Sequence, residues 1–237
     1  MKIIMLILAS DNVQHYIDSQ NLFKKYMNNH PNIKSLFCKC NPNLEQDFIF
    51  DQDNNTLYVK YQESYIPGIL YKTIKSFDYI CKNFEFDYIF KTNMSSVIDL
   101  DKMYTYISNN KLQYGDELIE TLSDSGVLEN ANGIKFSSEY GFFISKNTCI
   151  LLMNNEIIPY NSIDDAAIEY TINKLVEITE IPLTDIILNN PELLKPYNEF
   201  DKNIFHFRCR QETNDSETVV AQKIILNKIY PELNFTD

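Results

Sequence analysis

Apolar and polar positions along the first half of the chain form blocks that predict strands and helices in turn. The continuous apolar run over residues 2–9 is typical of a central parallel strand buried on both faces, and the helical spacing after it predicts an amphipathic helix. Asp11 or Asn12 is expected to cap that helix, and Asp99 a later one. The predicted strands are residues 2–9, 33–38, 56–60 and 87–91; the predicted helices run through 16–26, 68–82 and 99–107; residues 41–55 are predicted to form a loop.

The order of these elements predicts an α/β fold of the Rossmann type, with a mainly parallel sheet and helices on both of its faces. In such sheets, ligands bind beyond the carboxyl ends of the strands. The candidate site therefore lies at Ser10, after the first strand, and at the polar segment 92–96, after the fourth.

The second half of the chain is less regular. Its predicted elements are strands over residues 142–145 and 204–209, helices around 150–153, from 163 to about 178 and over 216–229, and strands and loops between 115 and 135. No internal repeat and no Pro- or Gly-rich linker divides the chain, which predicts a single domain over residues 1–237.

Composition narrows the classes of function. A hydrophobic fraction of 44% and an aromatic fraction of 13% are enough for a sizeable core. The formal net charge of −12 argues against a nucleic-acid partner, which needs a basic face, and against adsorption to anionic membranes. A small phosphate-bearing ligand needs only a local group of cations and is compatible with this charge. The apolar start over residues 1–9 is too short to cross a bilayer, so no membrane span is expected.

Cysteine and glycine usage exclude further classes. The five cysteines are scattered without CxxC spacing, and Cys38 and Cys40 are too close for an ordinary disulfide, which predicts reduced thiols in a cytoplasmic protein. The chain has only 5 glycines and contains neither GxGxxG nor GxxxxGK[ST]. A dinucleotide dehydrogenase or a P-loop enzyme is therefore not expected.

Four short motifs follow one another in the middle of the chain. Residues 63–73 read Glu-Ser-Tyr-Ile-Pro-Gly-Ile-Leu-Tyr-Lys-Thr, and residues 86–95 read Phe-Asp-Tyr-Ile-Phe-Lys-Thr-Asn-Met-Ser. Residues 140–145 read Tyr-Gly-Phe-Phe-Ile-Ser, and residues 163–168 read Ile-Asp-Asp-Ala-Ala-Ile. In this order the motifs resemble those of the galactosyltransferase and Fringe family of β-1,3-glycosyltransferases, over roughly residues 57–175.

The resemblance implies the GT-A fold and an inverting sugar transfer from a nucleoside-diphosphate donor to a glycan or glycoconjugate acceptor, with UDP as the expected nucleotide. It implies a nucleotide-binding half over about residues 1–110 and an acceptor half over about 111–237. It also implies that Asp165 is the base that takes the proton of the acceptor hydroxyl, with Asp164 in reserve. Adjacent acids at a helix start can equally cap the helix, and the two roles are compatible.

The chain departs from the family at the metal site. Where the family carries Asp-x-Asp, residues 93–95 read Asn-Met-Ser, whose uncharged oxygens would hold Mn²⁺ or Mg²⁺ weakly at best. We expect either no metal or a weakly bound one, on Asn93, Ser95 and His206 or with a carboxylate from elsewhere in the chain. An ordinary turn is the alternative for residues 92–96. The strings at 99–101 and 51–53 also read Asp-x-Asp, but a helix cap and a solvated loop explain them better.

Cations are the physical alternative to a metal at a diphosphate. Residues 204–210 alternate apolar and polar, so that His206, Arg208 and Arg210 would share one face of a strand and could clamp the diphosphate. A solvated strand edge explains the same pattern. By resemblance, His206 also matches a family histidine at the metal or diphosphate.

The remaining candidates for donor binding are Ser10, Lys72 and Thr92. A lysine on an amphipathic helix is more often solvated, and Ser10 could simply cap a helix. Glu63 is expected to cap a helix near Tyr65. His15 and His30 have no evident partners and are expected at the surface.

Two rival functions accompany the glycosyltransferase hypothesis. The first is a non-catalytic relative that binds nucleotide sugar or glycan, which the loss of Asp-x-Asp favours and the presence of Asp165 disfavours. The second is an unrelated nucleotide-binding domain, which would show no selective stabilisation by uridine nucleotides.

Overall fold

The computed structural model describes most of the chain. The described residues are 1–109, 118–121, 127–129, 135–137, 141–155, 158–172, 174–175, 179–181, 186–187, 205–209 and 215–235. Within them, no helix is both long enough and apolar enough to cross a membrane.

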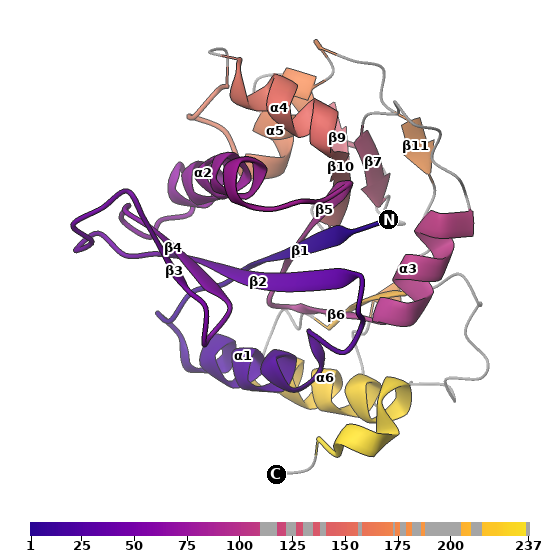
Figure 1. The fold of residues 1–237 in the computed structure, drawn as a ribbon. Coiled ribbons are helices and arrows are strands. Elements are labelled where there is room, and N and C mark those ends of the chain that lie inside the picture. The colour runs from indigo at the N-terminus through magenta and orange to yellow at the C-terminus, as the bar shows by residue number, and fades with distance from the viewer. Residues whose placement is uncertain are drawn as a thin grey trace.

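A mixed sheet of eight strands forms the centre of the protein (Figure 1). The strand order is β11-β7-β10-β5-β1-β2-β4-β3. The bounds are β1 Ile3–Leu8, β2 Ile33–Cys40, β3 Phe48–Asp51, β4 Thr56–Val59, β5 Tyr88–Asn93, β7 Leu118–Thr121, β10 Gly141–Ser145 and β11 Thr179–Ile181. Strands β5, β1, β2 and β4 run parallel, whereas β3 and β10 are antiparallel to their neighbours. The predicted α/β fold with a mainly parallel sheet is confirmed.

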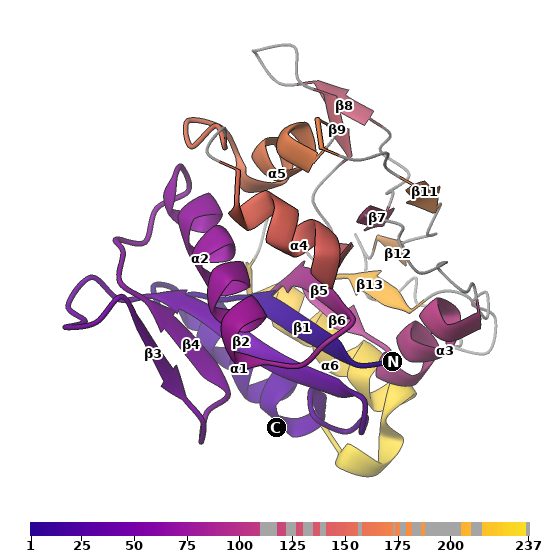
Figure 2. The same ribbon diagram turned by 45° about the horizontal axis from the view of Figure 1, so that its top comes forward.

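Helices cover both faces of this sheet (Figures 1 and 2). Helices α2, α4 and α5 pack together on one face, and α1 packs with α6 on the other. The helix bounds are α1 Gln14–Tyr26, α2 Gly68–Asn83, α3 Leu100–Asn109, α4 Lys146–Met153, α5 Asp164–Ile172 and α6 Asp215–Ile229. A short 3₁₀ helix, Pro231–Leu233, follows α6.

The first strand explains why its sequence is apolar at every position. All six residues of β1 are buried, because successive side chains point to opposite faces and both faces carry helices. Ile3, Met5 and Ile7 belong to the core on the α1 and α6 side. Ile4, Leu6 and Leu8 belong to the core under α2, α4 and α5.

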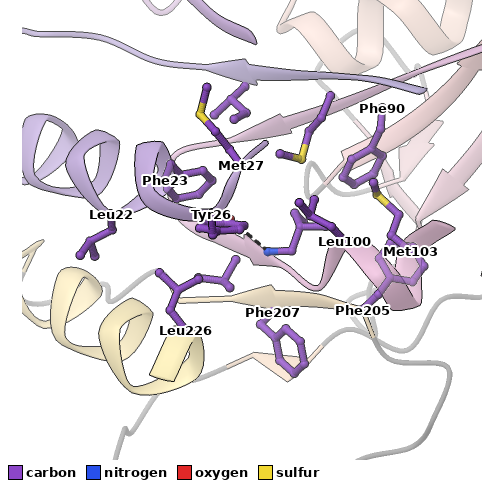
Figure 3. Packing of buried hydrophobic residues seen from close by; sticks show 14 of the residues in the cluster. Leu22, Phe23, Tyr26, Met27, Phe90, Leu100, Met103, Phe205, Phe207 and Leu226 are labelled. Atoms are coloured by element: carbon purple, nitrogen blue, oxygen red, sulfur yellow. Dashed lines mark hydrogen bonds between the residues drawn. The ribbon is translucent and has the colours of Figure 1, made fainter. Parts of the chain in front are cut away.

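The core on the α1 and α6 side ties distant parts of the chain together. Figure 3 shows Phe23 and Tyr26 of α1 close to Leu226 of α6 and to Phe207. The Tyr26 hydroxyl accepts a hydrogen bond from the backbone N–H of Ile98 at 3.5 Å. The end of the chain is therefore part of the same core as its beginning.

The connections of the sheet create a topological switch point beside β1. From β1 the chain proceeds outward to β2 and β4, and then returns through α2 to β5 on the opposite side of β1. The strand order therefore reverses beside β1, and the carboxyl ends of β1 and β5 meet where such sheets have a ligand crevice.

Two smaller sheets accompany the central one. Strand β6, Ser96–Ile98, follows β5 directly and joins β13, His206–Arg208, and β12, Ile186–Ile187, in a three-stranded sheet. Strands β8, Val127–Glu129, and β9, Lys135–Ser137, form a separate hairpin. Arg208 of β13 is paired with Ser96, the first residue of β6, and so lies near the end of β5.

Several sequence-based expectations about local structure were wrong. The predicted loop 41–55 contains the edge strand β3, whose antiparallel pairing with β4 depends on a partner that local sequence does not reveal. Helix α1 begins after Val13, and neither Asp11 nor Asn12 caps it, because the Asp11 carboxylate binds Lys39 at 2.7 Å. Helix α5 ends at Ile172, and residues 176–178 of the longer predicted helix lie outside the described residues.

Other expectations about helix starts and Asp-x-Asp strings are confirmed. The Asp99 carboxylate accepts a hydrogen bond from the Lys102 backbone N–H at 3.0 Å, as in a helix cap. The Asp51 carboxylate accepts hydrogen bonds from the Asn54 backbone and side chain in an exposed turn. These acids therefore have structural roles.

Candidate functional site

A cavity of about 480 Å³ opens at the carboxyl ends of β1 and β5, where the topology places a ligand crevice. Its walls come from the ends of β1 and β5 and the residues that follow them, and from α1, α2, α5, β13 and α6. Three cationic side chains and three carboxylates line it. These are Lys72, Lys91, Arg208, Glu63, Asp164 and Asp165.

Most of the residues predicted from the sequence meet in this cavity. Seven of the ten line it, although they come from segments as far apart as β1 and β13. They are Ser10, Lys72, Asn93, Ser95, Asp164, Asp165 and Arg208. Thr92 and His206 are buried outside its lining, and Arg210 lies outside the described residues.

Lys91 forms the central ion-pair group of the cavity. Its Nζ lies 2.7 Å from the Asp164 carboxylate and also donates to the Asp165 carboxylate. Only 5% of the Lys91 side chain and 10% of each acidic side chain is exposed. Burial alone would lower the pKa of Lys91, but the charges of Asp164 and Asp165 outweigh it and raise the pKa above its ordinary value. The ammonium is therefore permanently charged.

The two acids are held by the start of a helix as well as by Lys91. Asp164 and Asp165 are the first residues of α5, and the backbone N–H of Ala167 donates to the carbonyl of Ile163 at 3.0 Å. Asp164 therefore lies in the first turn of α5. The expectation that one of the two acids caps this helix was wrong for Asp164. Carboxylates in a first turn are stabilised by the partial positive charge of the helix N-terminus.

Lys72 and Glu63 form a second buried ion pair. Lys72 Nζ lies 2.6 Å from the Glu63 carboxylate and 2.9 Å from the Ala9 carbonyl oxygen, which ties α2 to the end of β1. The Glu63 carboxylate also accepts from the Cys40 backbone N–H at 3.3 Å. The predicted capping role of Glu63 was wrong, because α2 begins only at Gly68 and the carboxylate is turned toward Lys72.

The turn after β5 is fixed by hydrogen bonds of its own. Asn93 Oδ1 accepts from the Ser95 backbone N–H at 3.1 Å, from the Ser95 hydroxyl at 2.7 Å and from the Ser96 hydroxyl at 3.4 Å. From α6, Gln222 Nε2 donates to the Met94 carbonyl at 2.6 Å. The oxygens offered by Asn93 and Ser95 are therefore already engaged with each other.

His206 and Arg208 both lie on β13 but differ in their access to the cavity. Arg208 lines the cavity, whereas His206 is fully buried against the ring of Phe90. Burial, and then the charge of Arg208, lowers the pKa of His206 to about 3. His206 is therefore neutral at physiological pH, and of the two described residues of the predicted basic strand, Arg208 is the one placed to meet an anion.

Sequence reasoning missed several residues of the cavity. It assigned no role to Lys91, expected Glu63 to be a cap, and left His15 at the surface, although all three line the cavity. A signal for Lys91 was present, because a lysine within an apolar central strand must find an acidic partner in the core. The partners of Glu63 depend on tertiary contacts that no local pattern contains.

Comparison with known proteins identifies the fold of the chain. No protein-family model and no curated protein matches the chain. Among solved structures, a glycosyltransferase involved in the glycosylation of the major capsid of PBCV-1 is similar at a TM-score of 0.55 and 10% identity, over 94% of this chain and 100% of that one. An active-site mutant of LgtC matches at a TM-score of 0.50 and 10% identity, over 93% and 95% of the two chains.

A further match is the galactosyltransferase LgtC in complex with donor and acceptor sugar analogues, at a TM-score of 0.49 and 9% identity, over 94% of this chain and 95% of that one. The class that the comparisons define is the α/β fold of the GT-A glycosyltransferases. At this level of identity the likeness concerns the fold alone.

Proposed function

We propose that the protein is a glycosyltransferase that moves a sugar from a nucleoside-diphosphate donor, with UDP as the expected nucleotide, to a glycan or glycoconjugate acceptor. The observation that carries the proposal is the cavity at the switch point. It gathers two adjacent carboxylates, three cationic side chains and the polar ends of β1 and β5 in one place. That combination offers both halves of the chemistry, a cationic seat for a diphosphate and a carboxylate for a hydroxyl proton.

Donor binding is assigned to the side of the cavity formed by β1, α2 and β13. Ser10, Lys72 and Arg208 line it there, with Asn93 and Ser95 at the turn after β5. Lys72, which is paired with Glu63, supplies a single ammonium group, and Arg208 supplies a guanidinium whose geometry suits paired, charge-assisted hydrogen bonds to phosphate oxygens. Arg208 is therefore the residue on which diphosphate affinity should depend most.

The transfer step is assigned to Asp165. The acceptor hydroxyl oxygen forms a bond to the anomeric carbon, the bond from that carbon to the donor phosphate breaks, and the nucleoside diphosphate leaves with the bonding electrons. Asp165 takes the hydroxyl proton as the new bond forms. Attack from the face opposite the leaving group inverts the anomeric configuration, which agrees with the inverting family that the motifs resemble.

A second candidate is a binding protein without turnover. The ion pairs of Lys91 favour this candidate, because pairing with a buried lysine is a structural role that would explain both Asp164 and Asp165 without catalysis. In that case the cavity would bind nucleotide sugar or glycan and Asp165 would do no chemistry. Binding data alone do not separate the two candidates, but turnover does.

The donor assignment is tested by calorimetric titration with UDP and with uridine. Arg208→Ala should weaken UDP binding by tenfold or more, because a charge-assisted contact to phosphate is worth roughly 1.5–3 kcal/mol, and should leave uridine binding almost unchanged. Lys146→Ala is the control, since it removes an equal charge that does not line the cavity. Equal losses for UDP and uridine would show that Arg208 supports the fold and does not face the diphosphate.

A further inference from the structure

The GT-A fold and the motifs of this chain together imply a divalent metal at the donor diphosphate, and the residues present do not fit one. Metals such as Mn²⁺ and Mg²⁺ bind carboxylate, carbonyl and water oxygens. After β5 the chain offers Asn93 and Ser95, whose oxygens are engaged with each other inside the turn. Among the described residues, no group of three or more His, Cys, Asp or Glu side chains is placed to hold a metal ion.

The carboxylates that the cavity does bring together already share a cation. Asp164 and Asp165 both contact Lys91 Nζ, and the three side chains are almost completely buried. Buried charges are tolerated when they are paired, so removal of the ammonium would leave two uncompensated carboxylates. A divalent ion on the same oxygens would lie within a few ångströms of a permanently charged ammonium and be repelled by it.

Backbone geometry fixes the ammonium at this point. Lys91 is paired with Leu6 of β1 and with Phe142 of β10, in the middle of the sheet. Gly141, the first residue of β10, allows close approach, because a Cβ there would lie only 2.8 Å from the Lys91 carbonyl oxygen. Alternation then places Lys91 and Asn93 on the cavity side, and both line it, whereas Thr92 does not.

We propose that the ammonium group of Lys91 takes the place of the divalent metal in this site, as a cation built into the chain that holds Asp164 and Asp165 in position. Lys91 is thus a positioning residue, and the site needs no metal for its structure. This inference rests on the proposed function, because a fixed cation can replace a donor-site metal only in a site that binds a donor. Its test uses the protein without any donor, so that the two can fail separately.

The test replaces Lys91 by an uncharged side chain of similar length and asks whether a metal site appears. Lys91→Met leaves two adjacent carboxylates without their cation. We expect this variant to bind Mn²⁺ at least about tenfold more tightly than the wild-type protein does, because repulsion from an ammonium a few ångströms away costs at least that factor even in a high dielectric. Calorimetric titration with Mn²⁺ gives the affinities, and the melting temperature of Lys91→Met should rise with Mn²⁺ and fall back with EDTA.

Lys72→Met is the matched control. It also removes a buried lysine from the cavity, but it frees the single carboxylate of Glu63, and we expect no comparable gain in Mn²⁺ affinity. The proposal would be overturned if Lys91→Met bound Mn²⁺ no more tightly than the wild-type protein does, or no more tightly than Lys72→Met does. The wild-type protein provides a check that does not depend on folding of the variant: saturable Mn²⁺ binding that Asp165→Asn abolishes would contradict it equally.

Discussion

Individual residues of the cavity are governed by the cost of burying charge. Lys91 forms ion pairs with Asp164 and Asp165, and Lys72 forms one with Glu63, so that each of these charged groups has an opposite charge beside it. The acids at the start of α5 were predicted from the sequence because an acidic pair at a helix start is visible there. Their lysine partner, 74 residues away from Asp165, was not, because ion pairing across that separation depends on the fold.

His206 shows the opposite response to burial, and it predicts a dependence of stability on pH. In the folded protein the pKa of His206 is about 3, whereas in the unfolded chain it has its ordinary value near 6.5. Below pH 6.5 the unfolded state binds a proton that the folded state excludes. His206 therefore makes its full contribution to the free energy of unfolding above pH 6.5. That contribution, on the order of a few kcal/mol, should be lost as the pH drops from about 6.5 toward 3.

Urea unfolding of wild type and His206→Phe across this pH range isolates the effect, because carboxylates contribute equally to both proteins. The wild-type protein should lose more stability on acidification than the variant. Parallel pH profiles for the two proteins would mean that His206 is not the buried neutral group that the fold indicates.

Elements could be predicted from the sequence wherever a single pattern decides them. The apolar run of β1, the helical spacing of α2 and the closing helix α6 were all found, since burial of one stripe or of both strand faces leaves a periodic trace. Strand β3 was missed because its residues are only half buried and its identity depends on pairing with β4. Helix starts were predicted to within two residues for α1, α2, α3, α5 and α6. The capping residues were predicted less well, because the Asp11 carboxylate binds Lys39 and the Glu63 carboxylate binds Lys72.

The packing of α2 against α4 predicts a specific crosslink. Cys81 and Cys149 have their Sγ atoms 3.3 Å apart, and Cys81 is only half buried. The contact with Cys149 lowers the pKa of Cys81, whereas that contact and burial raise the pKa of Cys149. Hydrogen peroxide should therefore oxidise the Cys81 thiolate to a sulfenic acid, which the Cys149 thiol then attacks to form a disulfide and water.

Mass spectrometry should find the 81–149 disulfide, with a loss of two hydrogens, and the oxidised protein should be more stable by roughly 2–4 kcal/mol. Cys149→Ser is the control and should leave Cys81 as a sulfenic acid or a higher oxide. Disulfides that join Cys38 or Cys40 instead would contradict the predicted pairing.

At the scale of the whole molecule, the position of the site follows from topology more than from any motif. The reversal of direction beside β1 opens a crevice, and the segments after β1 and β5 reach it whatever their sequence. This explains how solved glycosyltransferases with about 10% identity can share the fold. The sequence allowed the α/β class and the carboxyl-end location to be predicted for the same reason, whereas the burial of His206 against Phe90 depended on tertiary packing that the local pattern does not contain.

The central claim is that this cavity transfers sugar with Asp165 as the base. Asp165→Asn keeps size and hydrogen bonding, and it leaves Lys91 paired with Asp164, so the variant should fold and bind donor normally. It cannot accept a proton, and a general base contributes typically ~10²–10⁴-fold to rate, so release of nucleoside diphosphate should slow by at least about a hundredfold. The companion change Asp164→Asn should cost stability and much less rate.

The decisive measurement is the rate of sugar transfer by wild type, Asp165→Asn and Asp164→Asn, with a sugar nucleotide that all three proteins bind. We predict wild-type turnover, nearly full turnover in Asp164→Asn and a loss of about a hundredfold or more in Asp165→Asn. Near-full transfer by Asp165→Asn would contradict the assignment of the base. Absence of transfer and of donor hydrolysis by the wild-type protein, with every sugar nucleotide that it binds, would contradict the claim of catalysis itself.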